Sequence, residues 1–312
     1  MSKEVSVLEM IQEMKLNCIN IAREDKIVKE SDINRPGMQL VGYYQFFPYE
    51  RIQVIGNAEY AYLQTLSNEE MLEKLDTFMT YNFPMLCVTR GHKISEAMIS
   101  LAKKHDRFLV QSDLPTTKFI SKISGYINNK TAPVEVTHGV LVDVDGLGIL
   151  IKGDSGIGKS EAALELIKRG HRLVSDDAVE IKKLEDDMLV GQSPEITQYM
   201  MEIRGIGLLD IKSLYGVGAV KPSKTIDLVA YLENWDENKY YDRLGMDEEY
   251  MEILGVKVPL IMVPVKPGRN IAVILEIAAR NQRQKFMGYN AAVEFNKKLI
   301  TKLAKESRKN KK

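Results

Sequence analysis

The residues with the clearest chemical role stand in one short segment, GDSGIGKS, at positions 153–160. The segment satisfies G-x-x-x-x-G-K-[ST], the pattern of loops that bind nucleotide phosphates. Its glycines let the backbone curl so that successive N–H groups point at phosphate oxygens. Lys159 can neutralise the terminal phosphates, and the Ser160 hydroxyl can bind Mg²⁺. A plain glycine turn would not explain a lysine and a serine at this place.

The residues on either side of the loop fit the same interpretation. The apolar GILI before it predicts a strand, and Ala163, Leu166 and Ile167 after it predict one face of a helix that ends at Gly170. The positive end of that helix dipole would lie at the phosphate site. The predicted nucleotide-binding residues are Gly153, Asp154, Ser155, Gly156, Ile157, Gly158, Lys159 and Ser160.

An acidic pair, Asp176 and Asp177, follows the next apolar segment, LVS. A carboxylate beside the phosphate loop could accept the proton of a phosphoryl acceptor or help to hold Mg²⁺. Because adjacent residues of a strand face opposite sides, we expect only one of the two to point at the terminal phosphate. Without the loop, the pair would more simply be a turn or a helix cap.

The strands and helices that must position these residues can be predicted from the apolar pattern, and they indicate an α/β protein in two parts. In the first part, PMLCVTR and RFLVQS predict strands, while KISEAMISLAKKH and TTKFISKISGYINNK predict helices. This alternation favours parallel pairing. The polar segment 128–133 ends in proline and is the predicted boundary, which gives domains of residues 1–130 and 131–312.

The second part is richer in strands. The segment before the phosphate loop predicts one strand, a turn at Asp145-Gly146 and a second strand, so the strand that feeds the loop is one arm of an antiparallel hairpin. Further strands are expected within residues 171–191, 200–211, 225–235 and 258–265. From about Ile271, the pattern predicts two helices joined around Met287-Gly288.

The composition excludes several classes of protein. The 312 residues have zero formal net charge, so binding to nucleic acid or to an acidic membrane is not expected. No apolar run approaches the roughly 20 residues of a membrane span, and the N-terminal segment lacks a signal-peptide pattern. Cys18 and Cys87 are too few for a disulfide scaffold or a metal site, and His92 and His105 read as structural or surface residues. We therefore expect a cytoplasmic protein.

Six motifs together resemble a known family. THGV, GDSGIGKS, LVSDD, MEIRGIGLLD, YDRLG and VPVKPGRN have the order and spacing of bacterial HPr kinase/phosphorylase, and TRGHKISEAMI is similar to its first domain. The resemblance implies a small N-terminal α/β domain for regulation or interaction and a C-terminal phosphate-loop kinase domain similar to PEP carboxykinase, assembled as a homohexamer. It implies phosphorylation of a serine of the phosphocarrier protein HPr by ATP or pyrophosphate, the reverse phosphorolysis by phosphate, and control of carbon catabolite repression and sugar uptake.

The resemblance also implies a set of site residues: His138, Lys159, Asp177 and Arg243 as catalytic residues, with Ser160 and Glu202 binding Mg²⁺. Asp177 would take the proton of the HPr serine and return it in the reverse direction. Arg243 would stabilise charge on the transferring phosphoryl group. Lys266 and Arg269 lie in the segment that the family ties to dephosphorylation. By residue type alone, His138 and Glu202 would be ordinary strand residues.

Two other functions remain open at this point. A small-molecule kinase or PEP-carboxykinase-like phosphotransferase would use the same loop with a deep, closed pocket, whereas a protein serine demands an open cleft. A non-catalytic nucleotide switch or DNA-associated regulator would need no base at Asp177.

Overall fold

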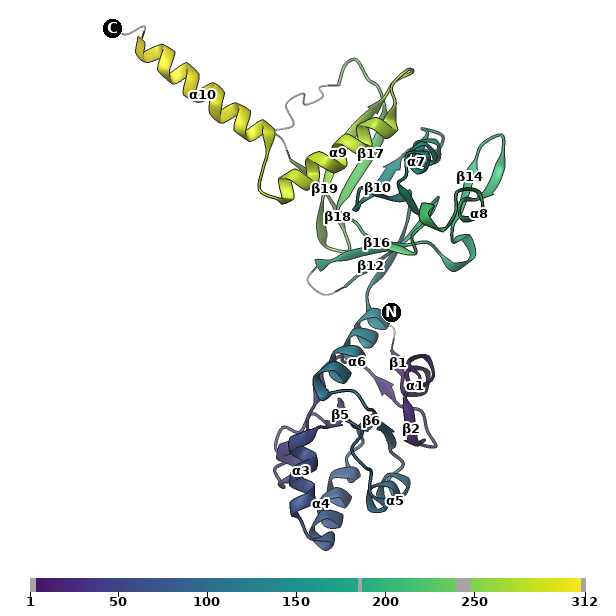
Figure 1. Cartoon of the computed structure of the whole chain (residues 1–312), viewed down its shortest axis with the longest axis vertical. Helices are drawn as coiled ribbons and strands as arrows, with labels where there is room; N and C mark the ends of the chain where they lie inside the picture. The colour runs from purple at the N-terminus through teal and green to yellow at the C-terminus, as the bar shows by residue number, and fades with distance from the viewer. Residues whose placement is uncertain (1–3, 185–186, 240–247, 310–312) are drawn as a thin grey trace. The chain divides into compact units, whose positions relative to one another are not determined.

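The computed structural model describes residues 4–184, 187–239 and 248–309 of the chain (Figure 1). The chain forms two compact units, residues 1–132 and 133–312, and both mix helices with strands. Residues 128–131, at the predicted boundary, form the last turn of a helix. Within the described residues, no helix is long and apolar enough to cross a membrane.

The first unit is built on a five-stranded sheet in the order β2-β7-β6-β5-β4. The strands are β2 (Asn17–Asn20), β4 (Ile33–Asn34), β5 (Ile52–Ile55), β6 (Met85–Val88) and β7 (Phe108–Gln111). β4 to β7 pair in parallel, and β2 joins the edge in the antiparallel direction. The parallel pairing predicted for the two apolar segments now seen as β6 and β7 is confirmed.

Helices cover both faces of this sheet, which explains why β5 and β6 are buried along their whole length. One face packs against α1 (Val7–Met14) and α6 (Thr116–Thr131). The other packs against α3 (Asn57–Thr65), α4 (Asn68–Thr80) and α5 (Glu96–Lys104). The short elements β1 (Val5–Ser6), β3 (Ile27–Val28) and α2 (Gly37–Leu40) complete the unit.

The second unit has a six-stranded sheet in the order β11-β9-β10-β17-β19-β18. The strands are β9 (Val140–Val144), β10 (Leu147–Gly153), β11 (Arg172–Ser175), β17 (Leu228–Asn234), β18 (Glu249–Ile253) and β19 (Val256–Val265). β10, β17 and β19 are parallel, and β9 pairs with β10 through the predicted hairpin. Asp145 and Gly146 both have positive φ, 52° and 83°, as the two-residue turn requires.

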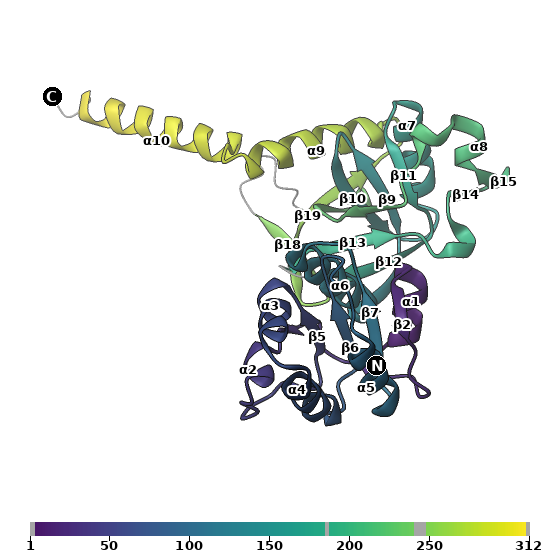
Figure 2. The same cartoon turned by 60° about the horizontal axis from the view of Figure 1, so that its bottom comes forward.

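Helices and a second sheet enclose the six-stranded sheet. Figure 2 shows α9 (Ile271–Phe286) on one side of β9 and β10, with the second sheet on the other. α7 (Lys159–Lys168) shares the core of α9. The second sheet has the order β16-β13-β12-β8, with β8 (Val134–His138), β12 (Ala178–Lys183), β13 (Leu189–Gln192) and β16 (Ser223–Thr225). α10 (Ala291–Lys309) follows α9, so the two predicted C-terminal helices are confirmed.

The sequence predicted one continuous strand before the Asp145-Gly146 turn, and this is wrong. The chain breaks at Gly139 into β8 and β9, which belong to different sheets. Gly139 lies so close to the adjoining backbone that a Cβ there would be 2.8 Å from the Ile151 carbonyl oxygen. Its N–H donates to the Asp177 carbonyl oxygen at 3.0 Å. This crossing places His138 next to the acidic pair.

A separate hairpin, β14 (Met200–Ile203) and β15 (Gly207–Asp210), precedes α8 (Ile211–Tyr215). It confirms the strands expected in residues 200–211. α7 contacts β14, so the hairpin lies beside the helix that follows the phosphate loop.

Candidate functional site

The phosphate loop connects β10 to α7, as the sequence predicts. Gly153, Gly156 and Gly158 have φ values of 140°, 82° and 100°, in the region that side chains disfavour. At Gly153 a Cβ would also lie 2.4 Å from the Leu232 carbonyl oxygen. The Lys159 ammonium folds over the loop and donates to the carbonyl oxygens of Gly153 and Asp154, each at 2.9 Å. The positive charge is therefore held above the loop, where phosphate oxygens can replace carbonyls as acceptors.

Asp176 ties this loop to the β14 strand. Its Oδ1 accepts a hydrogen bond from the Ser160 hydroxyl at 2.9 Å, and its Oδ2 accepts one from the Glu202 N–H at 3.0 Å. The side chain is buried, with 5% of its surface exposed. Burial raises the pKa of the Asp176 carboxyl, although the hydrogen bonds from Glu202 and Ser160 oppose the rise.

Asp177 lies on the same hollow but is open to solvent. Its Oδ1 is 3.6 Å from Nδ1 of His138, and the two side chains are 80% and 90% exposed. The pairing of β12 with β8 sets this proximity, because Ala178 lies opposite His138 in the ladder. The residue itself adopts a left-handed conformation, with φ at 64°.

Asp176 and Asp177 both line the same hollow, so strand alternation does not turn them to opposite sides; the expectation that only one of them points at the terminal phosphate stays a prediction. β11 ends at Ser175, so the two aspartates lie in the turn that follows, where strand alternation no longer applies. The left-handed conformation of Asp177 redirects the chain between β11 and β12.

This hollow has a volume of about 150 Å³. Its walls come from the phosphate loop, the first residues of α7, the two aspartates and β14, which contributes Glu202. The oxygens of Ser160, Asp176 and Glu202 are of the type that a small, hard cation prefers. Among the described residues, no group of three or more acidic, histidine or cysteine side chains could hold a metal ion by itself.

Arg204 is a further residue of this site that the sequence reasoning missed. It lies just after β14, and its Nη2 donates to the Ser155 hydroxyl at 3.0 Å. A Cβ at Gly156 would lie 2.7 Å from its Nη1, so the guanidinium lies directly against the loop. The only available signal was its place in MEIRGIGLLD, two residues after Glu202.

Lys266 and Arg269 do not line this hollow. Arg243 lies outside the described residues. Lys266 and Arg269 follow β19 and contact Trp235. Of the other histidines, His92 stacks on Tyr60 in the first unit, at 4.1 Å between ring centroids.

His105, in the same unit, bonds Asp76 at 2.6 Å. Cys18 and Cys87 are both free thiols. The hydrogen bond to Asp76 holds the His105 ring at the C-terminal end of α5.

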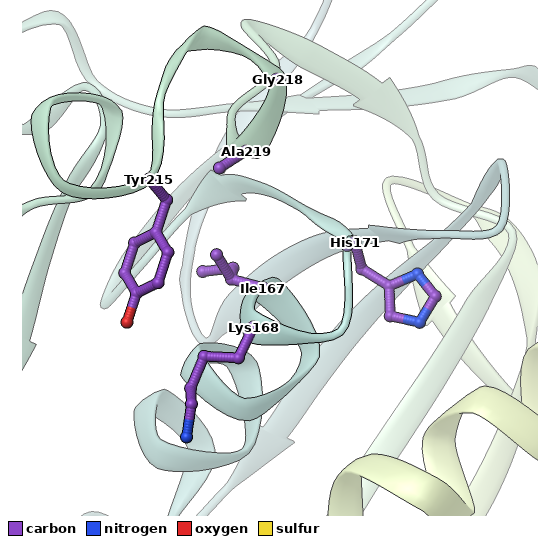
Figure 3. A pocket seen from close by; sticks show the side chains of 7 residues that line it. Ile167, Lys168, His171, Tyr215, Gly218 and Ala219 are labelled. Carbon is purple, nitrogen blue, oxygen red and sulfur yellow. The ribbon is translucent and has the colours of Figure 1, made fainter.

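A second hollow, of about 390 Å³, lies at the far end of α7 (Figure 3). Its lining includes Ile167, Lys168, His171 and Tyr215, and Figure 3 shows the polar ends of Lys168 and Tyr215 on one side with the His171 ring pointing away from them. The hollow adjoins the C-terminal end of the helix, where the dipole is negative and disfavours anions. The smaller hollow at the phosphate loop is therefore the better candidate for phosphoryl chemistry.

The fold and the loop define a class: a two-unit α/β protein with a nucleotide-phosphate loop motif beside an acid–base candidate. The family descriptions "HPr Serine kinase N terminus" and "HPr Serine kinase C-terminal domain" match residues 5–127 and 129–299. Together these matches span nearly the whole chain. The chain belongs to the HPr serine kinase family.

Two relatives of similar length agree with this assignment. The HPr kinase/phosphorylase of Peptoclostridium acidaminophilum is 54% identical over 97% of this chain and 98% of its own length. That of Caldanaerobacter subterraneus subsp. tengcongensis is 52% identical over 96% and 99%. The solved structure of the Hpr(Ser) kinase/phosphatase from Coxiella burnetii is 36% identical and covers 52% of this chain and 98% of its own, with a TM-score of 0.47.

Proposed function

We propose that this protein transfers a phosphoryl group from ATP or pyrophosphate to a serine of HPr, and that it removes the group again by attack of inorganic phosphate, which releases pyrophosphate. The names of the relatives support the substrate and the two activities. The observation that carries the proposal is the single hollow shared by the loop lysine, the loop serine and two aspartates of opposite exposure.

The donor phosphates bind in the loop from Gly153 to Ser160. Backbone N–H groups, the N-terminal end of α7 and the Lys159 ammonium all favour negative charge there. The hairpin strand β10 that feeds the loop supports a domain of the PEP-carboxykinase type. Ser160 and Glu202, with Asp176 beside them, would hold Mg²⁺, which neutralises charge on the donor phosphates when bound.

Asp177 is the group that exchanges the proton. In the forward direction it accepts the proton of the serine hydroxyl while serine Oγ bonds to the terminal phosphorus and the donor oxygen leaves. In the reverse direction an oxygen of inorganic phosphate bonds to the phosphoserine phosphorus, the bond to serine Oγ breaks, and Asp177 returns the proton. Its 80% exposure suits a substrate that arrives on a protein surface. His138 lies near enough to orient this carboxylate or to contact the attacking phosphate.

Arg204 places a second cation at the mouth of the loop. With a donor bound, its guanidinium can leave Ser155 and bond phosphate oxygens, for which its planar fork is suited. Arg243 keeps the role that the family implies, stabilisation of the transferring group.

The family also suggests the setting of this reaction. We propose a regulatory or interaction role for the N-terminal α/β domain, a homohexamer, a cytoplasmic location and a part in carbon catabolite repression. The alternative, a kinase of a small metabolite, is less favoured because Asp177 and His138 are so exposed.

The direct test supplies the full chain with HPr, Mg²⁺ and either ATP or pyrophosphate, and measures serine phosphate by mass spectrometry. We expect one phosphate per HPr, which excess inorganic phosphate then removes. Absence of labelling with both donors, while the chain still binds nucleotide, would reject HPr as the substrate.

A further inference from the structure

A lysine side chain joins the two sheets of the second unit beside the phosphate loop. Lys152 lies on β10 and immediately precedes Gly153, the first residue of the loop. Its ammonium group donates to the Thr137 hydroxyl at 2.7 Å. Thr137 lies on β8, in the other sheet, so this bond connects two strands that no backbone ladder joins.

The side chain of Lys152 lies on the face of β10 that is turned to the second sheet. Ile149 and Ile151 belong to the core shared with α7 and α9, whereas Leu150 belongs to the core between the two sheets. Because side chains alternate along a strand, Lys152 points the same way as Leu150. Lys152 and Thr137 are both half-buried there.

The backbone register places Lys152 opposite the break between β8 and β9. Ile151 pairs with Val140 in the antiparallel ladder of β10 and β9, so the next position brings Lys152 opposite Gly139. The Gly139 N–H donates to the Asp177 carbonyl oxygen at 3.0 Å. The strand that feeds the phosphate loop therefore adjoins the backbone that holds Asp177.

The bond to Thr137 fixes the other side of the same break. β8 ends at His138, one residue after Thr137, and Nδ1 of His138 is 3.6 Å from Oδ1 of Asp177. The two residues that flank Gly139 in the fold are thus tied on one side to Lys152 and on the other to the Asp177 turn. Through these contacts, Lys152 links the position of the Asp177 carboxylate to that of the loop.

A neutral partner leaves the charge of Lys152 uncompensated. Within the described residues, Lys152 forms no ion pair with a carboxylate, and its recorded side-chain partner is the Thr137 hydroxyl. Taking an ammonium group partly out of water has a desolvation cost, which a hydroxyl offsets less than a carboxylate does. An apolar pair would join the sheets without that cost, so stability alone does not account for a lysine at this position.

We propose that Lys152 is a positioning residue for phosphoryl transfer, whose bond to Thr137 sets the distance between the Asp177 carboxylate and the phosphate loop. The proposal rests on the proposed function, in which Asp177 exchanges the proton with the acceptor serine. Lys152 acts through Thr137 and Gly139 and is not itself a catalytic group. Because a misplacement of about 1 Å can cost about 10²-fold in rate, loss of this bond should be visible in kcat.

Two substitutions remove the bond from opposite ends. Lys152→Met removes the ammonium and keeps an unbranched side chain, and Thr137→Val removes the hydroxyl and keeps the branched shape. With HPr, Mg²⁺ and ATP, each should lower kcat about tenfold to hundredfold and leave the KM for ATP within about threefold, because the loop keeps its own residues. The double variant should be slower than the slower single variant by no more than about threefold. Lys152→Arg, which keeps a charged donor, should recover kcat to within about fivefold of the parent.

Lys257→Met is the matched control. Lys257 is an exposed lysine of the same sheet near the amino end of β19, whereas the phosphate loop follows the carboxyl end of β10, which runs in the same direction. This variant should leave both kcat and KM unchanged. Circular dichroism establishes that all the variants are folded.

Amide hydrogen exchange in the free chain tests the positioning without HPr. The Gly139 N–H should exchange at least about tenfold faster in Lys152→Met and in Thr137→Val, because the break that it closes is then less firmly held. It should exchange at the parental rate in Lys257→Met. The Gly148 N–H, which the Asp227 carboxylate accepts at 2.7 Å near the other end of β10, is the internal reference and should not change in any variant.

Three results would overturn the proposal. The first is a folded Thr137→Val variant that keeps either the parental kcat or the parental exchange rate of Gly139. The second is a rise in the KM for ATP in Lys152→Met as large as the fall in kcat, which would place Lys152 with the donor rather than with the base. The third is a loss of kcat that Lys152→Arg does not reduce. A parent chain that does not label HPr would reject the proposed function, and the exchange rates of Gly139 would then decide whether Lys152 holds the Asp177 turn.

Discussion

Replacing Asp177 by asparagine separates the proton transfer from the structure of the site. The residue has a φ of 64°, a conformation that asparagine tolerates and that alanine would adopt at a cost of roughly 1–2 kcal/mol. Its side chain is 80% exposed, so no core packing is lost. We expect the free energy of unfolding to change by no more than about 0.5 kcal/mol.

The catalytic effect should be far larger. A positioned general base contributes about 10²–10⁴ in rate, or roughly 2.7–5.4 kcal/mol of activation free energy. Phosphorylation of HPr by ATP and removal of the phosphate by inorganic phosphate should therefore both slow by two to four orders of magnitude. The nucleotide dissociation constant should not rise, since the change removes a negative charge from the hollow.

The assay measures both rates, nucleotide binding and thermal unfolding in the same preparations. Asp187→Asn is the matched control, because Asp187 is also exposed and left-handed, at a φ of 56°, but lies in the turn between β12 and β13 and pairs with Lys183. It should leave both rates unchanged. The reasoning is refuted if a folded Asp177→Asn variant keeps both rates within tenfold of the parent, or loses only one of them.

Three further predictions follow from the surroundings of the loop. Burial raises the pKa of Asp176, so its contribution to the free energy of unfolding falls as pH rises through the folded-state pKa. In urea denaturation, Asp176→Asn should therefore gain stability relative to the parent chain as the pH is raised from 4 to 7. A stability difference between variant and parent that is the same at both pH values would contradict this. Gly156→Ala and Gly158→Ala both place alanine in a left-handed conformation, at a cost of roughly 1–2 kcal/mol, but only the Cβ of the first meets Arg204. The nucleotide dissociation constant should therefore rise more in Gly156→Ala than in Gly158→Ala. Equal nucleotide binding by the two variants would argue against that contact. Arg204→Ala should raise the KM for ATP about tenfold or more. In the nucleotide-free chain, a double-mutant cycle of Arg204→Ala with Ser155→Ala should give a coupling of about 0.5–1.5 kcal/mol in the free energy of unfolding. Additive effects of the two substitutions would show that their hydrogen bond does not contribute to stability.

Local patterns in the sequence were sufficient for the parts of the fold that depend on near neighbours. The loop from Gly153 to Ser160, the Asp145-Gly146 turn and the two C-terminal helices each follow from a motif or periodicity within a few residues. The parallel pairing of β6 and β7 followed from the strand–helix–strand spacing. Each of these features is specified by short-range sterics and hydrophobic patterning.

The features that the sequence did not predict depend on contacts between distant segments. The break at Gly139 arises from the close approach of the Ile151 backbone, which no local pattern records. Arg204 meets Ser155 across 49 residues because a separate hairpin docks on α7. Asp176 and Asp177 differ in exposure because β11 ends one residue before them, and a strand boundary is decided by the sheet it joins.

The fate of the phosphoryl group is the most direct test of the central claim, that one site transfers it both ways. Phosphoserine-HPr is incubated with the full chain, Mg²⁺ and inorganic phosphate in ¹⁸O-labelled water, and the products are identified by mass spectrometry. We predict one unlabelled pyrophosphate for each serine released. Release of ¹⁸O-labelled inorganic phosphate without pyrophosphate would show that water is the attacking group, and would contradict a reversible transfer at a shared loop and carboxylate.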